Sequence, residues 1–255
     1  MRVLSTILSS LILFFEPAYL ANGKACSGTC DLSAHDWIFI LGTGRSGSTT
    51  LLEMVNTLPN VQLSGEHDAE LDSFIDLRKR LRLTLEHGGT GAWLQDRHQL
   101  KEAHLFCTVQ SWFFLHTGKP CSNTATHGFK EIRYNSKEEL DFLRDAFPSA
   151  KFILNFRKEV LLQSKSAWYK DAHGVENELN KTNAIFMKWA DANPARTRLM
   201  PLEDFTPGNF TVLFKWLGFS KCKALAVTHA NNGERTDGYQ HAPGDPASTK
   251  VVSCA

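Results

Sequence analysis

WIFILGTGRSGSTTLLEMVNTLP, residues 37–59, joins a short apolar run to a glycine-rich loop and then to a helical pattern that ends at Pro59. Residues 37–41 are apolar without interruption, which is typical of a strand buried in a parallel sheet. A helix is predicted over residues 48–58, so the loop opens onto a helix N-terminus. Backbone N–H groups and the positive end of the helix dipole meet at such a loop, and both favour a bound anion. The stretch therefore predicts an α/β unit with a phosphate site after its first strand.

The rest of the chain alternates further short strands with helices. The expected strands cover residues 61–63, 129–133 and 151–156, and the expected helices cover residues 67–86, 137–147, 159–171, 177–192 and 212–217. Strands that alternate with helices imply a parallel sheet covered on both faces. We predict an α/β fold of the P-loop-like, three-layer kind, with a central parallel sheet flanked by helices.

Length and composition limit the remaining choices. With 255 residues, 42% of them hydrophobic and 22% charged, the chain can build one large domain. The 28 Lys and Arg residues nearly balance the 27 Asp and Glu residues, so no overall basic field favours nucleic acid as a partner. We assign residues 36–220 to the main domain and expect residues 221–255 to form a loop-rich extension that packs on it.

The N-terminal segment favours entry into the secretory pathway. Residues 3–15 are about as long as the apolar core of a signal peptide and shorter than a membrane span. We expect residues 1–25 to be a signal peptide or a short Golgi-type anchor, with a buried N-terminal helix as the alternative. Two glycosylation sequons, at residues 180–182 and 209–211, agree with a location in the Golgi lumen or outside the cell.

The cysteines fit the same compartment. The chain has six Cys residues, which can pair in an oxidising lumen, but sequence alone does not select the pairing. A zinc site at Cys26 and Cys30 lacks a second pair of ligands nearby, and the histidines show no helical metal-ligand pair with a carboxylate. No metal is therefore expected.

The glycine-rich loop differs from a nucleotide P-loop at one position. The spacing from Gly42 to Gly47 matches that motif, but Ser48 stands where the motif requires lysine. The loop thus lacks the side chain that contacts a γ-phosphate, and Arg45 is the only cation within it. A P-loop kinase or nucleotidase stays as the alternative enzyme, and an inactive secreted binding protein of the same fold stays as the non-enzyme alternative.

Two segments resemble the sulfotransferases, enzymes that use 3′-phosphoadenosine 5′-phosphosulfate (PAPS). Residues 37–66 are similar to the 5′-phosphosulfate loop of that family, and the Arg-Ser-Gly-Ser-Thr core at residues 45–49 resembles the Golgi-type carbohydrate and protein-tyrosine members more than the cytosolic ones. FILNFRKEVLLQSKSAWY, residues 152–169, resembles the 3′-phosphate motif, a strand that ends in Arg and precedes a helix with Ser. WLGF at residues 216–219 also recurs in such domains, and the resemblance covers roughly residues 36–220.

The resemblance implies a donor site built from both motifs, without a metal. Arg157 would grip the 3′-phosphate through its guanidinium, with Ser164 or Ser166 as its partner. Ser166 is preferred because Ala-Trp-Tyr follows it, and a salt bridge from Arg157 to Glu159 or Asp171 is the structural alternative. The 5′-phosphate would be held by the loop, namely by Gly44, Arg45, Ser46, Gly47, Ser48, Thr49 and Thr50.

The resemblance also implies a general base and a cation at the reacting group. Glu66 lies in a Gly-Glu setting like that of the protein-tyrosine enzymes and is the expected base, while His67 is its rival because histidine titrates near neutrality. Lys130 and Arg45 would stabilise charge on the leaving phosphate and the sulfuryl oxygens, with Arg133 as the substitute for Lys130. The acceptor stays open among a glycan, a protein tyrosine and a small metabolite, and a membrane would be a partner only through an uncleaved anchor.

Three further sequence features are a basic run, an aromatic run and an arginine near the C-terminus. The basic run at residues 78–82 either steers an acidic acceptor or forms a solvated helix face. Residues 112–114, Trp-Phe-Phe, are expected in the core, and Arg235 in the C-terminal extension could close over the donor.

Overall fold

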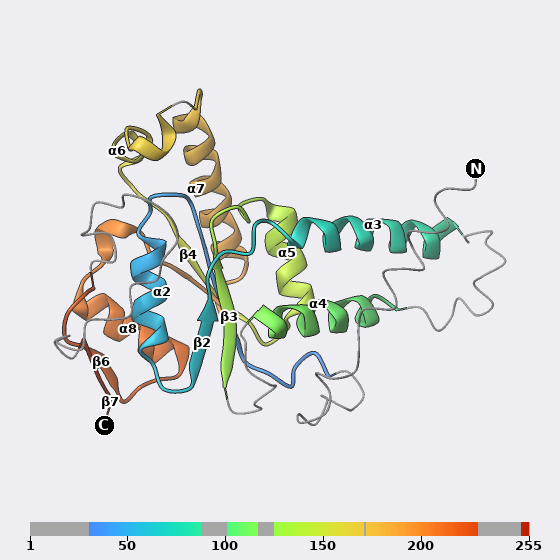
Figure 1. Ribbon diagram of the computed structural model, residues 1–255, viewed down its shortest axis with the longest axis horizontal. Coiled ribbons are helices and arrows are strands. Elements are labelled where there is room, and N and C mark those ends of the chain that lie inside the picture. Colours follow the sequence, from blue (N-terminus) through green and yellow to red (C-terminus); the bar gives the residue numbers. More distant parts are fainter. Residues whose placement is uncertain (1–30, 88–100, 117–124, 171, 229–250, 255) are drawn as a thin grey trace.

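A five-stranded parallel sheet lies at the centre of the computed structural model, with the strand order β2-β3-β1-β4-β5 (Figure 1). The structure describes residues 31–87, 101–116, 125–170, 172–228 and 251–254. The strands are β1 (Trp37–Gly42), β2 (Val61–Ser64), β3 (Thr126–Glu131), β4 (Lys151–Asn155) and β5 (Thr197–Leu199). The predicted α/β fold is confirmed, and the short β5, which the sequence pattern does not reveal, adds the last strand.

Seven helices accompany this sheet in the described part of the chain. They are α2 (Ser48–Asn56), α3 (Leu71–His87), α4 (Glu102–His116), α5 (Lys137–Ala146), α6 (Val160–Ser164), α7 (Val175–Ala192) and α8 (Pro207–Leu217). The sequence pattern does not reveal α4, because its apolar residues are spread around the helix and give no clear amphipathic period. The single helix expected over residues 159–171 is wrong. The extended backbone of Ser166 separates α6 from a short 3₁₀ helix, η3 (Ala167–Tyr169).

The helices cover the two faces of the sheet in different numbers. One face packs on α2 and α8 through a core that includes Ile40 and Ile153. The other face packs on α3, α4, α5 and α7 through a core that includes Phe39, Phe129 and Phe152. Side chains alternate between faces along a strand, and register partners on parallel strands share a face. Together with the register, this rule assigns each strand residue to one of the two faces of the sheet.

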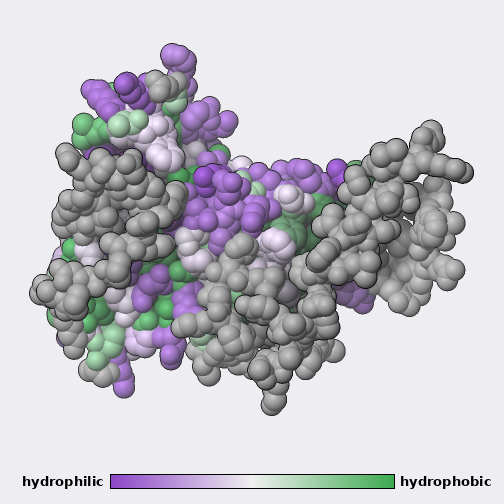
Figure 2. All heavy atoms as spheres, viewed as in Figure 1, coloured by the Kyte–Doolittle hydropathy of each residue, from purple (hydrophilic) through white to green (hydrophobic). Residues whose placement is uncertain are grey.

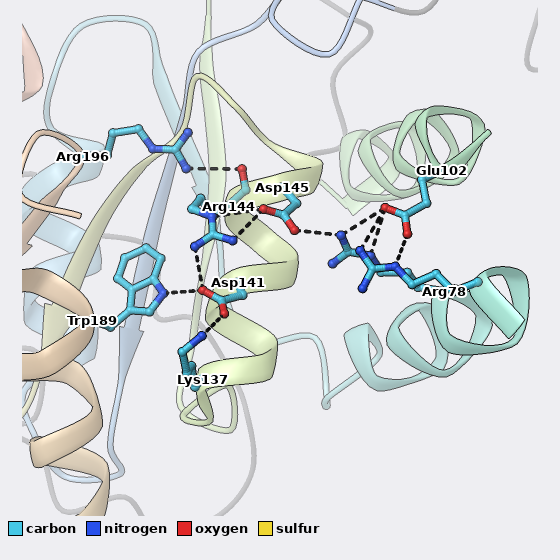
Figure 3. A network of polar contacts seen from close by, with 9 residues as sticks. Arg78, Glu102, Lys137, Asp141, Arg144, Asp145, Trp189 and Arg196 are labelled. Carbon is cyan, nitrogen blue, oxygen red and sulfur yellow. Dashed lines mark hydrogen bonds and ion pairs between the residues drawn. The ribbon is translucent and has the colours of Figure 1, made fainter. Parts of the chain in front are cut away.

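Helices α3 and α4 run alongside each other and extend beyond the sheet (Figure 1). Arg78 of α3 has a side chain that is only 11% exposed. Its guanidinium pairs with Glu102 of α4 at 3.1 Å and with Asp145 of α5 at 2.7 Å (Figure 3). It also lies 5.0 Å from the ring centroid of Phe106. A buried guanidinium with two carboxylates and an aromatic face ties the three helices together.

This arrangement changes the interpretation of the basic run at residues 78–82. Arg78 and Arg82 both pair with Glu102, and Lys79 pairs with Glu138 at 3.0 Å. Arg78, Lys79 and Arg82 are therefore paired with carboxylates of the protein, while Arg80 is exposed. The aromatic expectation at residues 112–114 is correct for Phe113 and Phe114, which are buried, but Trp112 is 37% exposed.

The C-terminal residues return to the domain as a small hairpin. Strand β6 (Cys222–Ala224) pairs antiparallel with β7 (Val252–Cys254), and a disulfide joins Cys222 to Cys254. Cys222 and Ala224 are buried in the core beneath α8. Cys107 is also disulfide-bonded, so every cysteine among the described residues is oxidised.

We expect Cys222→Ser to lower the free energy of unfolding by about 3–4 kcal/mol. The disulfide spans a sequence separation of 32 residues, and closing a loop of that length restricts the unfolded chain by about this amount. Urea unfolding of the oxidised protein measures the change. Cys254→Ser should give the same loss, and the double variant should lose no more than either single one. A loss below about 1 kcal/mol would mean that the hairpin holds the extension without the disulfide.

Some expectations concern segments outside the described residues. The expected signal peptide or anchor at residues 1–25 and Arg235, which was expected to close over the donor, both lie there. In the described part of the chain, the helices lack the combination of length and apolar character needed to cross a membrane. The asparagines of both sequons, Asn180 and Asn209, are exposed.

Candidate active site

The carboxyl ends of β3, β1 and β4 bring the candidate residues to one edge of the sheet. Lys130 pairs in register with Ile40, and Asn155 pairs with Gly42, which begins the glycine-rich loop. Neighbouring strands lie about 4.8 Å apart, so Lys130 and the end of β4 flank the loop on its two sides. Figure 2 shows hydrophilic side chains gathered on this part of the surface, between the α6–α7 end of the molecule and the start of α3. Open α/β sheets bind ligands at this edge.

The loop between β1 and α2 has the backbone of an anion-binding turn. Arg45 (φ 62°) and Gly47 (φ 82°) both adopt left-handed conformations, and Gly47 is the N-cap of α2 without a side-chain capping bond. Alternating backbone handedness turns successive N–H groups to one side, and the first turn of a helix leaves its own N–H groups without intrahelical acceptors. A Cβ on Gly47 would lie 2.6 Å from Leu202 Cδ1, so glycine is required here.

Two buried polar side chains hold the loop in this conformation. Ser46 donates its hydroxyl proton to Thr43 O at 2.6 Å and contacts Asn155 Oδ1. Asn155, at the end of β4, donates through Nδ2 to Ser46 O at 3.0 Å and to Met200 O at 2.8 Å. Both residues are fully buried. The sequence analysis missed Asn155, although a polar residue that ends an apolar strand run was a usable signal.

The α6–η3 segment covers the other side of the loop. Gln163 Nε2 donates to Thr43 Oγ1 at 2.8 Å and to Gly44 O at 2.6 Å, and Tyr169 donates its hydroxyl proton to Gly44 O at 3.1 Å. Burial raises the pKa of Tyr169, which keeps this donor protonated. Any side chain at Gly44 would collide with the Tyr169 hydroxyl, 2.7 Å from its Cβ. Gln163 and Tyr169 were also missed by the sequence analysis.

The loop presents its cation outward and most of its hydroxyls inward. Arg45 is exposed, whereas Ser48 and Thr50 are buried and Thr49 is half-buried. Because α2 begins at Ser48, these three residues form its first turn. An anion at the helix N-terminus would therefore meet backbone N–H groups, the dipole and Arg45 together.

Arg157 lies just past β4, on the α6 side of the loop. Its Nε is buried and 3.8 Å from Glu203 Oε1, too far for a hydrogen bond. Of the two partners in the alternative salt bridge, Asp171 lies outside the described residues, and the carboxylate found near Arg157 is that of Glu203 and not that of Glu159. The Ser166 hydroxyl is buried and has no hydrogen-bond partner in the described residues. Ser164 instead donates its hydroxyl proton to Glu176 Oε1 at 3.1 Å or to Leu161 O. Arg157 and Ser166 thus keep hydrogen-bonding capacity for a ligand.

Glu66 follows β2 and meets Lys130 of β3. The Lys130 ammonium donates to Glu66 Oε1, and Arg133 NH1 donates to Glu66 Oε2 at 3.2 Å. The Lys130 side chain is 7% exposed and the Glu66 side chain is 18% exposed. Both side chains are therefore mostly buried, and each keeps a small part of its surface in contact with solvent. The structure brings Glu66, Lys130 and Arg133 together, as a site for proton transfer beside a cation requires.

His67 points away from this pair. Its ring is buried, and the ring nitrogen Nε2 lies 2.8 Å from Ser64 Oγ. The ring also packs against the rings of Phe113 and Phe129, at centroid distances of 5.3 and 5.0 Å. Those phenylalanines belong to the core on the α3–α4 side of the sheet. The geometry therefore favours Glu66 over His67 as the group that faces an acceptor.

The described residues contain no cluster of three or more His, Cys, Asp or Glu side chains that could hold a metal ion. The cations at the sheet edge are Arg45, Lys130, Arg133 and Arg157, and the carboxylates of Glu66, Glu131 and Glu203 contact three of them. This donor set suits anionic ligands, because ammonium and guanidinium groups bind phosphate and sulfate oxygens directly.

Comparison with known proteins gives the following matches. The family model described as the sulfotransferase family matches residues 36–213. Among solved structures, the sulfotransferase domain of the Synechococcus PCC 7002 olefin synthase is 18% identical, with 73% of this chain and 74% of that chain covered at a TM-score of 0.45. A sulfotransferase from Alicyclobacillus acidocaldarius is 13% identical (71% and 80% covered, TM-score 0.43), and shikimate kinase from Aquifex aeolicus is also 13% identical (72% and 97% covered, TM-score 0.38). No curated protein sequence matches the chain significantly.

Proposed function

Because this chain belongs to the sulfotransferase family, we propose that it transfers a sulfuryl group from PAPS to an acceptor hydroxyl. The observation that carries the proposal is the placement of a carboxylate–lysine pair on one side of a phosphate-type loop and an arginine on the other. A donor with phosphates at both its 3′ and 5′ positions needs two separate anion sites. The loop and Arg157 supply them at the same sheet edge.

The residues present fit this donor. The first turn of α2 and Arg45 would hold the 5′-phosphate. Glycine at positions 44 and 47 lets Tyr169 and Leu202 pack against the loop, because a Cβ at either position would collide with them. Arg157 and the Ser166 hydroxyl would hold the 3′-phosphate, and Ser166 is preferred to Ser164 because its hydroxyl is buried without a partner. The donor supplies an activated sulfuryl group, and the protein supplies position and charge.

In the proposed reaction the acceptor oxygen forms a bond to sulfur while the bond from sulfur to the 5′-phosphate oxygen breaks. Glu66 takes the proton of the acceptor hydroxyl. Lys130 donates hydrogen bonds to the oxygens on which negative charge accumulates, and Arg45 neutralises the leaving phosphate. The two phosphate sites would fix the donor so that its sulfur lies in line with the acceptor oxygen. Fixing the reactants in this geometry lowers the entropic cost of reaction.

We also propose an oxidising compartment of the secretory pathway as the setting. The support is that Cys107, Cys222 and Cys254 are all disulfide-bonded, and such bonds form and persist in secreted and lumenal proteins. The signal segment and the exposed sequon asparagines agree with that setting. The acceptor belongs to the class of hydroxyl compounds, among which a glycan, a protein tyrosine and a small metabolite are the candidates to assay.

A binding experiment tests the proposed donor. We expect adenosine 3′,5′-bisphosphate, the product that remains after transfer, to bind with the same affinity in calorimetry with and without EDTA. Arg157→Ala should weaken this ligand about 30- to 150-fold while leaving adenosine 5′-phosphate unchanged, because a charge-assisted bidentate contact contributes about 2–3 kcal/mol. Arg45→Ala should weaken both ligands.

Lys158→Ala is the matched control, since Lys158 adjoins Arg157 but is exposed and pairs with Asp204. Equal affinity for ATP and for the bisphosphate, or loss of binding on chelation, would contradict the proposed donor. Transfer of labelled sulfate from PAPS to a panel of glycan, tyrosine-peptide and phenol acceptors then identifies the acceptor class.

A further inference from the structure

Glu131 is a fully buried carboxylate that the proposed reaction does not use. It ends β3, next to Lys130 in sequence, and its exposed fraction is 0%. Lys130 shares a face with its register partner Ile40, on the α2 side, whereas Glu131 shares a face with Leu41 on the side of α3, α4 and α5. The Glu131 side chain therefore lies on the opposite face of the sheet from the Lys130 side chain.

Burying a carboxylate is costly unless donors surround it, and Glu131 has four hydrogen bonds. Its Oε1 accepts from the backbone N–H groups of Ile132 at 2.8 Å and Arg133 at 3.1 Å, and from Arg133 NH1 at 3.0 Å. Its Oε2 accepts from the backbone N–H of His67 at 2.9 Å. The last bond crosses from β3 to the segment that follows β2.

These contacts fix Glu66 at two points. The bond to the His67 N–H holds the backbone immediately after Glu66. Arg133 NH1 lies between two carboxylates, 3.0 Å from Glu131 Oε1 and 3.2 Å from Glu66 Oε2, so Glu131 also holds the cation that contacts the Glu66 carboxylate. A Cβ at Gly65 would meet nothing within 4 Å, so packing does not hold the backbone beside Glu66. Without the Glu131 bonds, Glu66 would be held only by Lys130 and by an Arg133 side chain that has lost its anchor.

We propose that Glu131 is a positioning residue that holds Glu66 against Lys130 from the far face of the sheet. It does not touch the reacting atoms and acts only through Glu66 and Arg133. This inference rests on the proposed function, because Glu66 has to be the proton acceptor for its position to matter. An error of about 1 Å in a reacting group can lower a rate by about 100-fold.

The test uses Glu131→Gln, which keeps the side-chain shape but replaces one acceptor oxygen with an amide that cannot accept. We expect kcat to fall about 10- to 100-fold while the affinity for adenosine 3′,5′-bisphosphate changes less than threefold. Glu139→Gln is the matched control. Glu139 is a partly buried carboxylate that accepts from the Asn135 and Ser136 N–H groups at 2.7 Å in the capping box of α5, without contact to Glu66. The Glu139→Gln variant should be less stable than the wild-type protein and should keep kcat within about twofold of the wild-type value.

A double-mutant cycle separates positioning from a general structural role. If Glu131 acts through Glu66, then Glu131→Gln should change kcat less than about twofold in the Glu66→Gln background. Equal losses in both backgrounds would overturn the inference, as would an unchanged kcat for Glu131→Gln. Glu131→Asp keeps the charge and shortens the side chain, so its kcat should lie between those of the wild type and Glu131→Gln. This variant replaces Glu131→Gln in the test if the glutamine variant does not fold.

Amide hydrogen exchange supplies a measurement that needs no activity. Glu131→Gln should speed exchange of the His67 amide at least about tenfold, and Glu139→Gln should not. If the wild-type protein fails to transfer sulfate while this protection is found, the proposed function fails and the anchoring of the Glu66 segment stands. If transfer occurs and the His67 amide exchanges equally in wild type and variant, the positioning role fails alone.

Discussion

Glu66→Gln is expected to lower turnover about 10²- to 10⁴-fold while the affinity for adenosine 3′,5′-bisphosphate stays within about threefold. Glutamine keeps the size of the side chain but cannot take a proton from the acceptor. The donor site should survive because the proposed phosphate contacts come from the loop and from Arg157, which lie apart from the Glu66–Lys130 pair. Initial rates at saturating PAPS and acceptor, with calorimetry on the same samples, measure the two quantities.

His67→Gln is the control for this prediction. The His67 ring is buried among core aromatic residues, so its loss should lower stability and leave turnover within about fivefold. A near-normal rate for Glu66→Gln together with a collapse for His67→Gln would transfer the base role to His67. Modest losses in both variants would mean that the acceptor is an amine or is already ionised.

Lys130→Met is expected to lower kcat about 10²- to 10³-fold, which is the cost of removing one fixed donor from a developing negative charge. Methionine has a similar length and fits the shielded position, where the lysine side chain is 7% exposed. Arg133 NH1 still contacts Glu66 in this variant, so the carboxylate keeps one cationic partner. The affinity for the bisphosphate product should fall less than the rate, because Lys130 acts on charge that is largest in the transition state.

Two further variants define what Lys130 contributes. Lys130→Arg keeps the charge and should retain more activity than Lys130→Met. Arg133→Met removes the neighbouring cation and should cost less than Lys130→Met, because the Arg133 side chain is 38% exposed and shared among Glu66, Asp68 and Glu131. If Arg133→Met had the larger effect on kcat, Arg133 would be the cation that contacts the transferring group.

Local sequence patterns predicted the elements that carry the site. The apolar run at residues 37–41, the glycines of the loop and the helical pattern after it correctly predicted β1, the loop and α2. Helix α4 and strand β5 were missed, since the first has no clear amphipathic period and the second is three residues long. The helix expected over residues 159–171 was too long, because its pattern does not reveal the extended Ser166.

The sequence by itself determined the chemistry available: a loop with Arg45 and no P-loop lysine, an arginine after β4, and a carboxylate after β2. These signals are local, because they depend on residues a few positions apart. The tertiary structure alone decided which groups meet. Glu66 and Lys130 are 64 residues apart in sequence, and only the placement of β3 between β2 and β1 brings them together. The same pairing turned His67 into the core and placed Glu131 behind Glu66, because alternation along a strand assigns a face only after the sheet has formed and both of its sides are covered.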